Sequence, residues 1–225
     1  LRMATYAAQV ETLDHGVGRV LEALRQTGRM HRTLITFLSD NGGASPGGVF
    51  GAGPLEKVGT PEAPVKTTYG KGWATLSNTP FRKHKANAHE GGVMSPLVLH
   101  WPERLGTRQV LRHDVAHITD IAPTVFGTVG SERVQHDFSG IDLLNTRRDS
   151  ESPVFYEHQK SRAVRKGKWK LVNRGKSNEW ELYDLATDRT ERNDLATSEP
   201  SHLKRLRQLW VDWAQRNHVK YGKGD

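Results

Sequence analysis

TLITFLSDNGG, residues 33–43, is the stretch that best predicts how this chain folds. Its first six residues are mostly β-branched, aromatic or leucine, a pattern typical of a short buried strand, and turn-forming residues follow at once. In an open α/β sheet, ligands bind outside the carboxyl ends of the strands, and the side-chain oxygens of Asp40 and Asn41 suit a hard cation. A plain strand-to-turn exit has the same composition, so this stretch alone leaves both interpretations open.

Length and composition indicate one domain, or one domain with a small appendage, in a soluble globular protein. Hydrophobic residues make up 35% of the 225 residues and charged residues 26%, and no apolar run approaches the ~18 residues of a membrane span. The 33 Lys and Arg residues exceed the 25 acidic ones, which gives a net charge of +8. Because this surplus is scattered, we interpret it as a basic surface suited to steering anionic substrates, and we expect no nucleic-acid partner. Cysteine is absent, which excludes disulfides and thiolate chemistry.

The periodicity of apolar residues predicts the elements around this strand. Residues 1–28 are predicted to form an amphipathic helix, and residues 96–101 a second buried strand. Residues 43–83 are rich in Gly, Pro, Ser and Thr and are predicted to form a long functional loop or lid. Residues 113–129 are predicted to form a helix that Pro123 kinks or breaks.

The character of the chain changes near residues 147–152, where we place a boundary between domains 1–150 and 151–225. The second domain is predicted to contain an antiparallel sheet of four short strands, at residues 153–157, 162–164, 169–172 and 180–183. Pro200 is predicted to open a final helix with a buried apolar stripe, formed by Leu203, Leu206, Trp210, Trp213 and Ala214.

Two blocks of sequence, together with pieces of the tail, resemble the type I sulfatases. The first block runs from Tyr6 to Gly43 and contains YAAQVETLD, GRVLEAL and FLSDNGG. The second contains GWA at 72–74, SNTPFR at 77–82, Lys85 and HEGG at 89–92, and the tail adds GKWKL at 167–171 and WELYDL at 180–185. Because both blocks occur in the family's order, the chain resembles the arylsulfatase-like branch over nearly its whole length.

The resemblance implies an α/β fold. We expect a partial, truncated alkaline-phosphatase-like sheet domain, followed by a small C-terminal antiparallel sheet packed with a terminal helix. The family's nucleophile is a formylglycine made from Cys, sometimes Ser, in a Cys-x-Pro-Ser-Arg signature, and neither form occurs here. The chain therefore resembles only the C-terminal part of a sulfatase, and we expect it to be inactive alone. The family also implies a periplasmic or secreted location, although this chain carries no signal peptide.

The resemblance also implies a site for a metal ion and a sulfate group. In the family a Ca²⁺ ion, with Mg²⁺ as an alternative, anchors the sulfate beside the formylglycine. Asp40 and Asn41 match the later pair of metal ligands, and Lys85, five residues before Glu90, matches a lysine that contacts a sulfate oxygen. Hydrolysis of a sulfate ester spreads negative charge over the transferred group, so a divalent cation and a fixed ammonium lower the barrier.

Three further residues are candidates with a structural alternative. His89 either contacts the substrate or donates a proton, or it is a structural histidine beside Glu90. Trp73 and Asn78 either line the substrate pocket or pack the loops around it.

The sequence leaves the reaction open between related classes. Asp40 and Asn41 supply roughly two or three of the about 6–8 oxygen ligands that Ca²⁺ takes, so the site is expected to be incomplete. The expected substrate is an aryl, alkyl or sugar sulfate. The alternatives are a phosphoric or phosphonic monoester hydrolase of the same superfamily and a non-catalytic module that binds polyanions. The oligomeric state is not predicted.

Overall fold

The computed structural model describes residues 1–64, 66–130, 138–173, 175 and 179–220. These residues form two compact units. The first unit comprises Leu1–Lys85 and Glu90–Val110, and the second comprises Ala86–His89 and Leu111–Asp225. The short segment Ala86–His89 therefore belongs to the second unit, although both of its chain neighbours belong to the first. The boundary near residues 147–152, between the predicted domains 1–150 and 151–225, stays a prediction.

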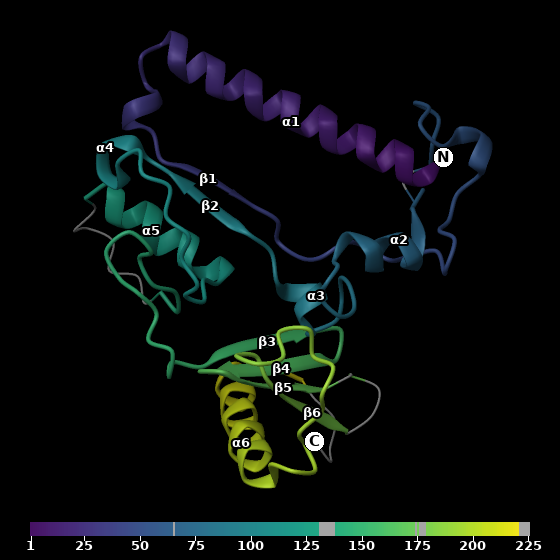
Figure 1. Ribbon diagram of the computed structural model, residues 1–225, viewed down its shortest axis with the longest axis vertical. Coiled ribbons are helices and arrows are strands. Elements are labelled where there is room, and N and C mark those ends of the chain that lie inside the picture. The colour runs from purple at the N-terminus through teal and green to yellow at the C-terminus, as the bar shows by residue number, and fades with distance from the viewer. Residues whose placement is uncertain (65, 131–137, 174, 176–178, 221–225) are drawn as a thin grey trace. The chain divides into compact units, whose positions relative to one another are not determined.

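The first unit contains a two-stranded antiparallel sheet (Figure 1). Its strands are β1 (Ile35–Leu38) and β2 (Leu97–His100), paired so that Ile35 lies opposite His100 and Leu38 opposite Leu97. Both strands were predicted, although as buried strands, whereas neither contains a buried residue. Their antiparallel pairing places the end of β1 beside the start of β2. The loop that follows β1 therefore lies near the segment that precedes β2.

The longest element of the first unit is helix α1 (Arg2–Gln26), which confirms the predicted helix. It ends at Gln26, two residues before Gly28, the expected stop, whose φ of 67° is in the left-handed region that glycine adopts without strain. None of its residues is buried, and Val10, Leu13 and Val20 of its apolar stripe are exposed. Within the part of the chain that is described, no helix is long and apolar enough to cross a bilayer.

The long loop predicted for residues 43–83 is partly helical, so that prediction is wrong in part. It contains a 3₁₀ turn, η2 (Leu55–Lys57), and the helix α2 (Gly70–Ser77). The loop is fastened by α1, because the Arg2 guanidinium donates hydrogen bonds to the carbonyl oxygens of Ala52 and Gly53, at 2.5 Å each. These contacts explain how a Gly-rich segment is ordered. The smaller helical elements of this unit are η1 (Met30–Arg32), α3 (Glu90–Val93) and α4 (Pro102–Leu105).

The helix predicted at residues 113–129 begins later than expected. The 3₁₀ turn η3 (Ile118–Asp120) leads directly into α5 (Ile121–Thr128). Pro123 is the third residue of α5, where backbone N–H groups have no acceptor within the helix, so the proline neither kinks nor breaks it. The buried carboxylate of Asp120 holds this start by accepting the backbone N–H groups of His117 and Ile141, at 2.8 and 3.0 Å, and by pairing with Arg148.

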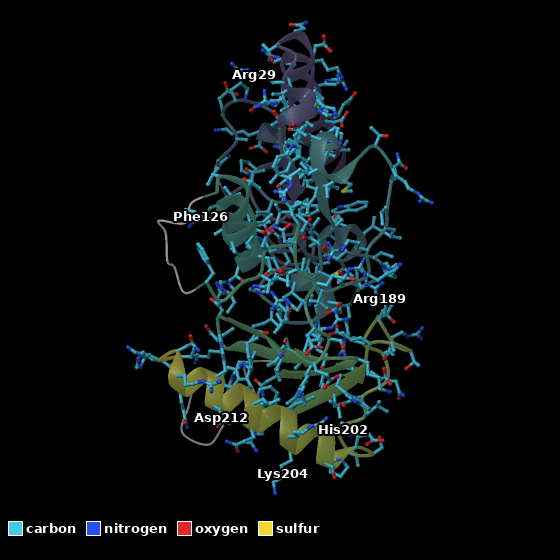
Figure 2. The ribbon with its side chains drawn as sticks, turned by 90° about the vertical axis from the view of Figure 1, so that its left-hand side faces the viewer. Arg29, Phe126, Arg189, His202, Lys204 and Asp212 are labelled. Atoms are coloured by element: carbon cyan, nitrogen blue, oxygen red, sulfur yellow. The ribbon has the colours of Figure 1, made fainter. Side chains whose placement is uncertain are left out.

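The second unit contains the predicted antiparallel sheet and terminal helix. Its strands, in spatial order, are β3 (Val154–His158), β4 (Ser161–Lys166), β5 (Trp169–Asn173) and β6 (Trp180–Asp184). Helix α6 (Pro200–Arg216) packs against one face of this sheet (Figure 1). Leu206, Trp210 and Ala214 of α6 are fully buried against strand residues that include Leu171 and Leu182. On α6, Lys204 points away from the sheet (Figure 2), so the helix is amphipathic as predicted.

Candidate functional site

The loop that follows β1 carries the two predicted metal ligands. Asp40 is exposed and Asn41 is half-buried. The hydroxyl of Ser39 donates a hydrogen bond to the carbonyl oxygen of Asn41, at 2.8 Å, which closes a tight turn around Asp40. Two further bonds fix the end of the loop, because the Gly42 N–H donates to the Gly92 carbonyl, at 3.0 Å, and the Gly43 N–H donates to the Asn78 side chain.

Gly42 permits this loop to approach the backbone of α3. A Cβ atom at Gly42 would lie 1.9 Å from the carbonyl oxygen of Gly91. Real Cβ atoms do not come so close to a backbone oxygen, so only glycine fits here. The Asp-Asn-Gly sequence therefore has a packing role as well as turn chemistry.

Lys85 lies beside the same loop. Its backbone N–H donates to the carbonyl oxygen of Gly43, at 3.0 Å, and its side chain is exposed. This bond joins Gly43, two residues after Asn41, to the predicted sulfate contact, which lies 42 positions further along the chain. The structure thus brings the backbones of the three predicted site residues into one cluster within the first unit.

The turn that presents Lys85 has an uncommon backbone. Lys83 and Ala86 have φ angles of 70° and 71°, in the left-handed region that residues with a Cβ adopt rarely. The N–H of Gly91 donates to the carbonyl oxygen of Arg82, at 2.8 Å, and ties the start of this turn to α3. Such strain persists only where surrounding contacts fix the chain, and it is frequent at functional sites.

Asn78 braces the cluster. Its Oδ1 accepts the Gly43 N–H at 2.9 Å, and its Nδ2 donates to the carbonyl oxygens of Ala74 and Lys83, at 2.8 and 3.2 Å. Since three of the four hydrogen bonds available to a side-chain amide go to backbone groups, this geometry favours the loop-packing alternative. Its role in substrate binding stays a prediction.

Two aromatic residues lie at the start of α2 and within it, Tyr69 and Trp73. Trp73, on α2, keeps 42% of its surface exposed, so its indole is available to a ligand. Tyr69 stacks on Tyr6, with ring centroids 4.8 Å apart, and its hydroxyl lies against Gly43, where a Cβ would be 2.6 Å away. Burial raises the pKa of Tyr69 above its usual value, so the hydroxyl keeps its proton at neutral pH. Only one feature of the sequence pointed to Tyr69, namely an aromatic residue in a Gly-rich segment.

The donor set at the strand end is that of a partial cation site. Among the described residues, no group of three or more His, Asp or Glu side chains is arranged to hold a metal ion. Asp40 and Asn41 offer oxygen ligands of the kind a hard cation prefers, but fewer than the about six that Ca²⁺ needs. These residues fit one part of a coordination shell.

His89 is placed differently from the other candidates. It belongs to the second unit, is 1% exposed, and its Nε2 lies 2.7 Å from Oε2 of Glu181. The Tyr183 hydroxyl donates to the same oxygen at 2.9 Å. These contacts favour the structural alternative for His89, while its catalytic role stays untested. Sequence reasoning missed Glu181, and the only signal was an acid within WELYDL, at a strand position with buried neighbours.

The chain is similar to known proteins over most of its length. One family model, described as sulfatase, matches residues 2–131, and a second, described as the C-terminal part of N-sulphoglucosamine sulphohydrolase, matches residues 83–215. An uncharacterized sulfatase of Schizosaccharomyces pombe is 30% identical over 240 residues, which cover 93% of this chain and 42% of the relative. The arylsulfatase of Klebsiella aerogenes is 30% identical over 151 residues, covering 62% of this chain and 30% of that enzyme.

Solved structures with similar folds include two of interest. A structure of Ps i-CgsB in complex with k-i-k-neocarrahexaose has a TM-score of 0.70 at 23% identity, covering 93% of this chain and 42% of that one. The phosphonate monoester hydrolase SpPMH from Silicibacter pomeroyi has a TM-score of 0.59 at 18% identity, covering 91% and 39%. They confirm the predicted alkaline-phosphatase-like α/β fold. The chain spans about two fifths of the length of these structures and of the yeast relative.

Proposed function

Because the chain belongs to the sulfatase family, we propose that it forms the C-terminal part of a sulfuric ester hydrolase. In this proposal Asp40 and Asn41 are metal ligands and Lys85 contacts the sulfate group. The observation that carries it is the hydrogen bond from the Lys85 N–H to the Gly43 carbonyl. That bond holds the backbone of the lysine beside the Asp40–Asn41 turn, as a shared site for a cation and an oxyanion requires.

The chemistry assigned to these residues is electrostatic. Lys85 donates hydrogen bonds from its ammonium to a sulfate oxygen, where negative charge develops as the ester bond breaks. Asp40 and Asn41 would hold Ca²⁺, or alternatively Mg²⁺, and the bound ion would neutralise charge on the sulfate. The other metal ligands and the formylglycine nucleophile come from outside these 225 residues, so the chain by itself is inactive.

The proposed substrate is the sulfate ester of an aryl, alkyl or sugar alcohol. A related fold, that of BT4656, was solved with D-glucosamine-2-N,6-O-disulfate as its substrate, which supports the sugar class. The exposed indole of Trp73 is assigned to the organic part of the substrate, since aromatic faces commonly line such sites. A periplasmic or secreted location is part of the same proposal.

Two alternatives remain to be tested against it. The phosphonate monoester hydrolase with a similar fold supports hydrolysis of a phosphoric or phosphonic monoester. The net charge of +8 supports a non-catalytic module that binds polyanions.

A fusion of this chain to the N-terminal part of the Klebsiella arylsulfatase that precedes the matched segment tests all three. With Ca²⁺ present, we expect the fusion to hydrolyse p-nitrophenyl sulfate at least about tenfold faster than p-nitrophenyl phosphate, and the unfused chain to hydrolyse neither. A preference for the phosphate ester would favour the alternative hydrolase. Absence of turnover in a folded fusion, together with salt-dependent retention of the chain on heparin, would favour the polyanion-binding module.

A further inference from the structure

The segment Ala86–His89 is anchored within the second unit. Ala88 is buried, and its backbone N–H donates to the hydroxyl of Ser161, on β4, at 2.8 Å. His89 is also buried and contacts Glu181, on β6. Two consecutive residues are therefore fixed to two different strands of one sheet.

The contact between His89 and Glu181 indicates which ring nitrogen of His89 carries a proton. Glu181 Oε2 lies 2.7 Å from His89 Nε2 and also accepts the Tyr183 hydroxyl at 2.9 Å. A hydrogen bond to a carboxylate oxygen requires a proton on Nε2. Nδ1 is buried and has no hydrogen-bond partner among the described residues, so a proton there would be an unsatisfied buried donor. The hydrogen bond to Glu181 therefore places a proton on Nε2.

This anchor lies next to the proposed sulfate contact in the chain. Only three peptide bonds separate Ala88 from Lys85, so an anchored Ala88 reduces the number of conformations open to the chain that carries Lys85. Ala86, between them, has the left-handed φ of 71°, a conformation that persists only when the flanking chain is fixed. Two hydrogen bonds hold the chain within the first unit on either side of the anchored segment. They join the Lys85 N–H to the Gly43 carbonyl oxygen and the Gly91 N–H to the Arg82 carbonyl oxygen.

We propose that Glu181, acting through His89, is a positioning residue for Lys85. The inference rests on the function proposed above, because it assigns a role to a residue that orders the lysine of that site. Glu181 fixes the tautomer and orientation of His89, and His89 with Ala88 then fixes the chain that carries Lys85. Removal of the carboxylate releases this segment, whereas an acceptor of the same shape retains it.

Amide hydrogen exchange of the 225-residue chain, followed by NMR, tests the anchor. In Glu181→Ala, we expect exchange at the Lys85 and Gly91 amides to rise about tenfold or more, since both depend on local ordering. Glu181→Gln retains an oxygen that accepts both bonds and should restore the wild-type rates. The Leu195 amide, which donates to the Leu182 carbonyl at 2.8 Å, reports the rest of the unit and should not change. Glu157→Ala, which removes an exposed acid on β3, is the matched control.

Titration with inorganic sulfate tests the link to function. The Lys85 signals of the wild type should shift on addition of sulfate, with an affinity several-fold lower in Glu181→Ala and unchanged in Glu181→Gln and Glu157→Ala. Wild-type exchange at Lys85 and Gly91 in Glu181→Ala would overturn the proposal, as would an equal rise at Leu195, which indicates a purely structural role. If Glu181→Ala does not fold, Tyr183→Phe removes the hydrogen bond from the Tyr183 hydroxyl to Glu181 and should raise the Lys85 and Gly91 rates about two- to threefold, and unchanged rates would overturn the proposal. If the wild-type Lys85 signals do not shift on addition of sulfate, the proposed function is wrong, and so is the functional role of Glu181. Amide exchange still reports whether Glu181 orders this segment.

Discussion

At the scale of single residues, the site depends on the close approach of two loops. Gly42 and Gly43 donate backbone hydrogen bonds to Gly92 and Asn78, and Gly43 accepts one from Lys85. The sequence predicted Asp40, Asn41 and Lys85 from composition and from the resemblance. It offered loop packing as one of two roles for Asn78, but it predicted neither Gly43 as the partner of Asn78 nor Glu181 as the partner of His89, because pairing between residues 35 and 92 positions apart leaves no local pattern.

Gly42→Ala tests whether this approach is as close as described. The added Cβ would lie 1.9 Å from the Gly91 carbonyl oxygen, so the loops must separate, and we expect a loss of about 2–3 kcal/mol in the free energy of unfolding. Urea denaturation measures it. Gly18→Ala, on α1, is the control, since nothing lies within 4 Å of its Cβ position and a helical alanine should stabilise by about 0.5–1 kcal/mol. Equal effects of the two substitutions would contradict the described packing.

Lys168 and Asp184 give a pH-dependent prediction at the same scale. The Lys168 ammonium, 2.6 Å from the carboxylate, lowers the pKa of Asp184 by hydrogen bonding to it, and the Ala186 N–H adds to the effect. A carboxyl whose pKa is lower in the folded state stabilises the fold above its unfolded pKa of about 4, and this contribution is lost as the pH falls through the folded value. Lys168→Met should therefore be less stable than wild type at about pH 7, with a difference that shrinks below about pH 4.

Urea midpoints measured across that range check the prediction. Lys204→Met, at an exposed position on α6, controls for the loss of one positive charge. A Lys168→Met deficit that stays constant down to the lowest pH would show that Asp184 is not the group responsible.

At the scale of elements, sequence patterns predicted the strongly periodic segments and missed the weak ones. The four strands and the terminal helix of the second unit were predicted because the sequence contains short strand-like runs separated by turn residues, followed by an apolar stripe with helical spacing. Helix α2 was missed because GKGWATLS contains two glycines, and its order comes from contacts elsewhere in the chain. The start of α5 was placed too early because the apolar spacing continues ahead of it. The expected kink or break at Pro123 was wrong, because a proline in the first turn of a helix is tolerated.

Helix α6 provides the prediction at this scale. Trp210 is fully buried against the sheet, and its Nε1 donates to the Tyr156 carbonyl oxygen at 3.3 Å. Trp210→Ala leaves a large cavity and should reduce the free energy of unfolding by about 3–5 kcal/mol. Arg205→Ala, at an exposed position on the same helix, should change it by less than about 0.5 kcal/mol. Thermal denaturation followed by circular dichroism separates the two, and a Trp210→Ala protein as stable as Arg205→Ala would contradict the described core.

At the scale of the whole molecule, family membership was predicted from ordered motifs and is confirmed by matches that together span residues 2–215. The α/β fold is confirmed by solved structures. The metal and sulfate roles stay predictions, because a shell of about 6–8 oxygens is assembled from distant parts of a sheet and only two of the candidate ligands lie in this chain. The central claim is therefore that Asp40, Asn41 and Lys85 act together on one sulfate group.

The measurement that tests this claim most directly is kcat/KM for p-nitrophenyl sulfate in the fusion described above. Lys85→Ala and Asp40→Ala should each lower it by about 10²–10³-fold, the usual loss when a group that stabilises developing charge is removed. Lys71→Ala, at an exposed position on α2, should leave it within about twofold of the unsubstituted fusion. If Lys85→Ala behaves like Lys71→Ala in an active fusion, Lys85 is a surface lysine and the account of the site is wrong.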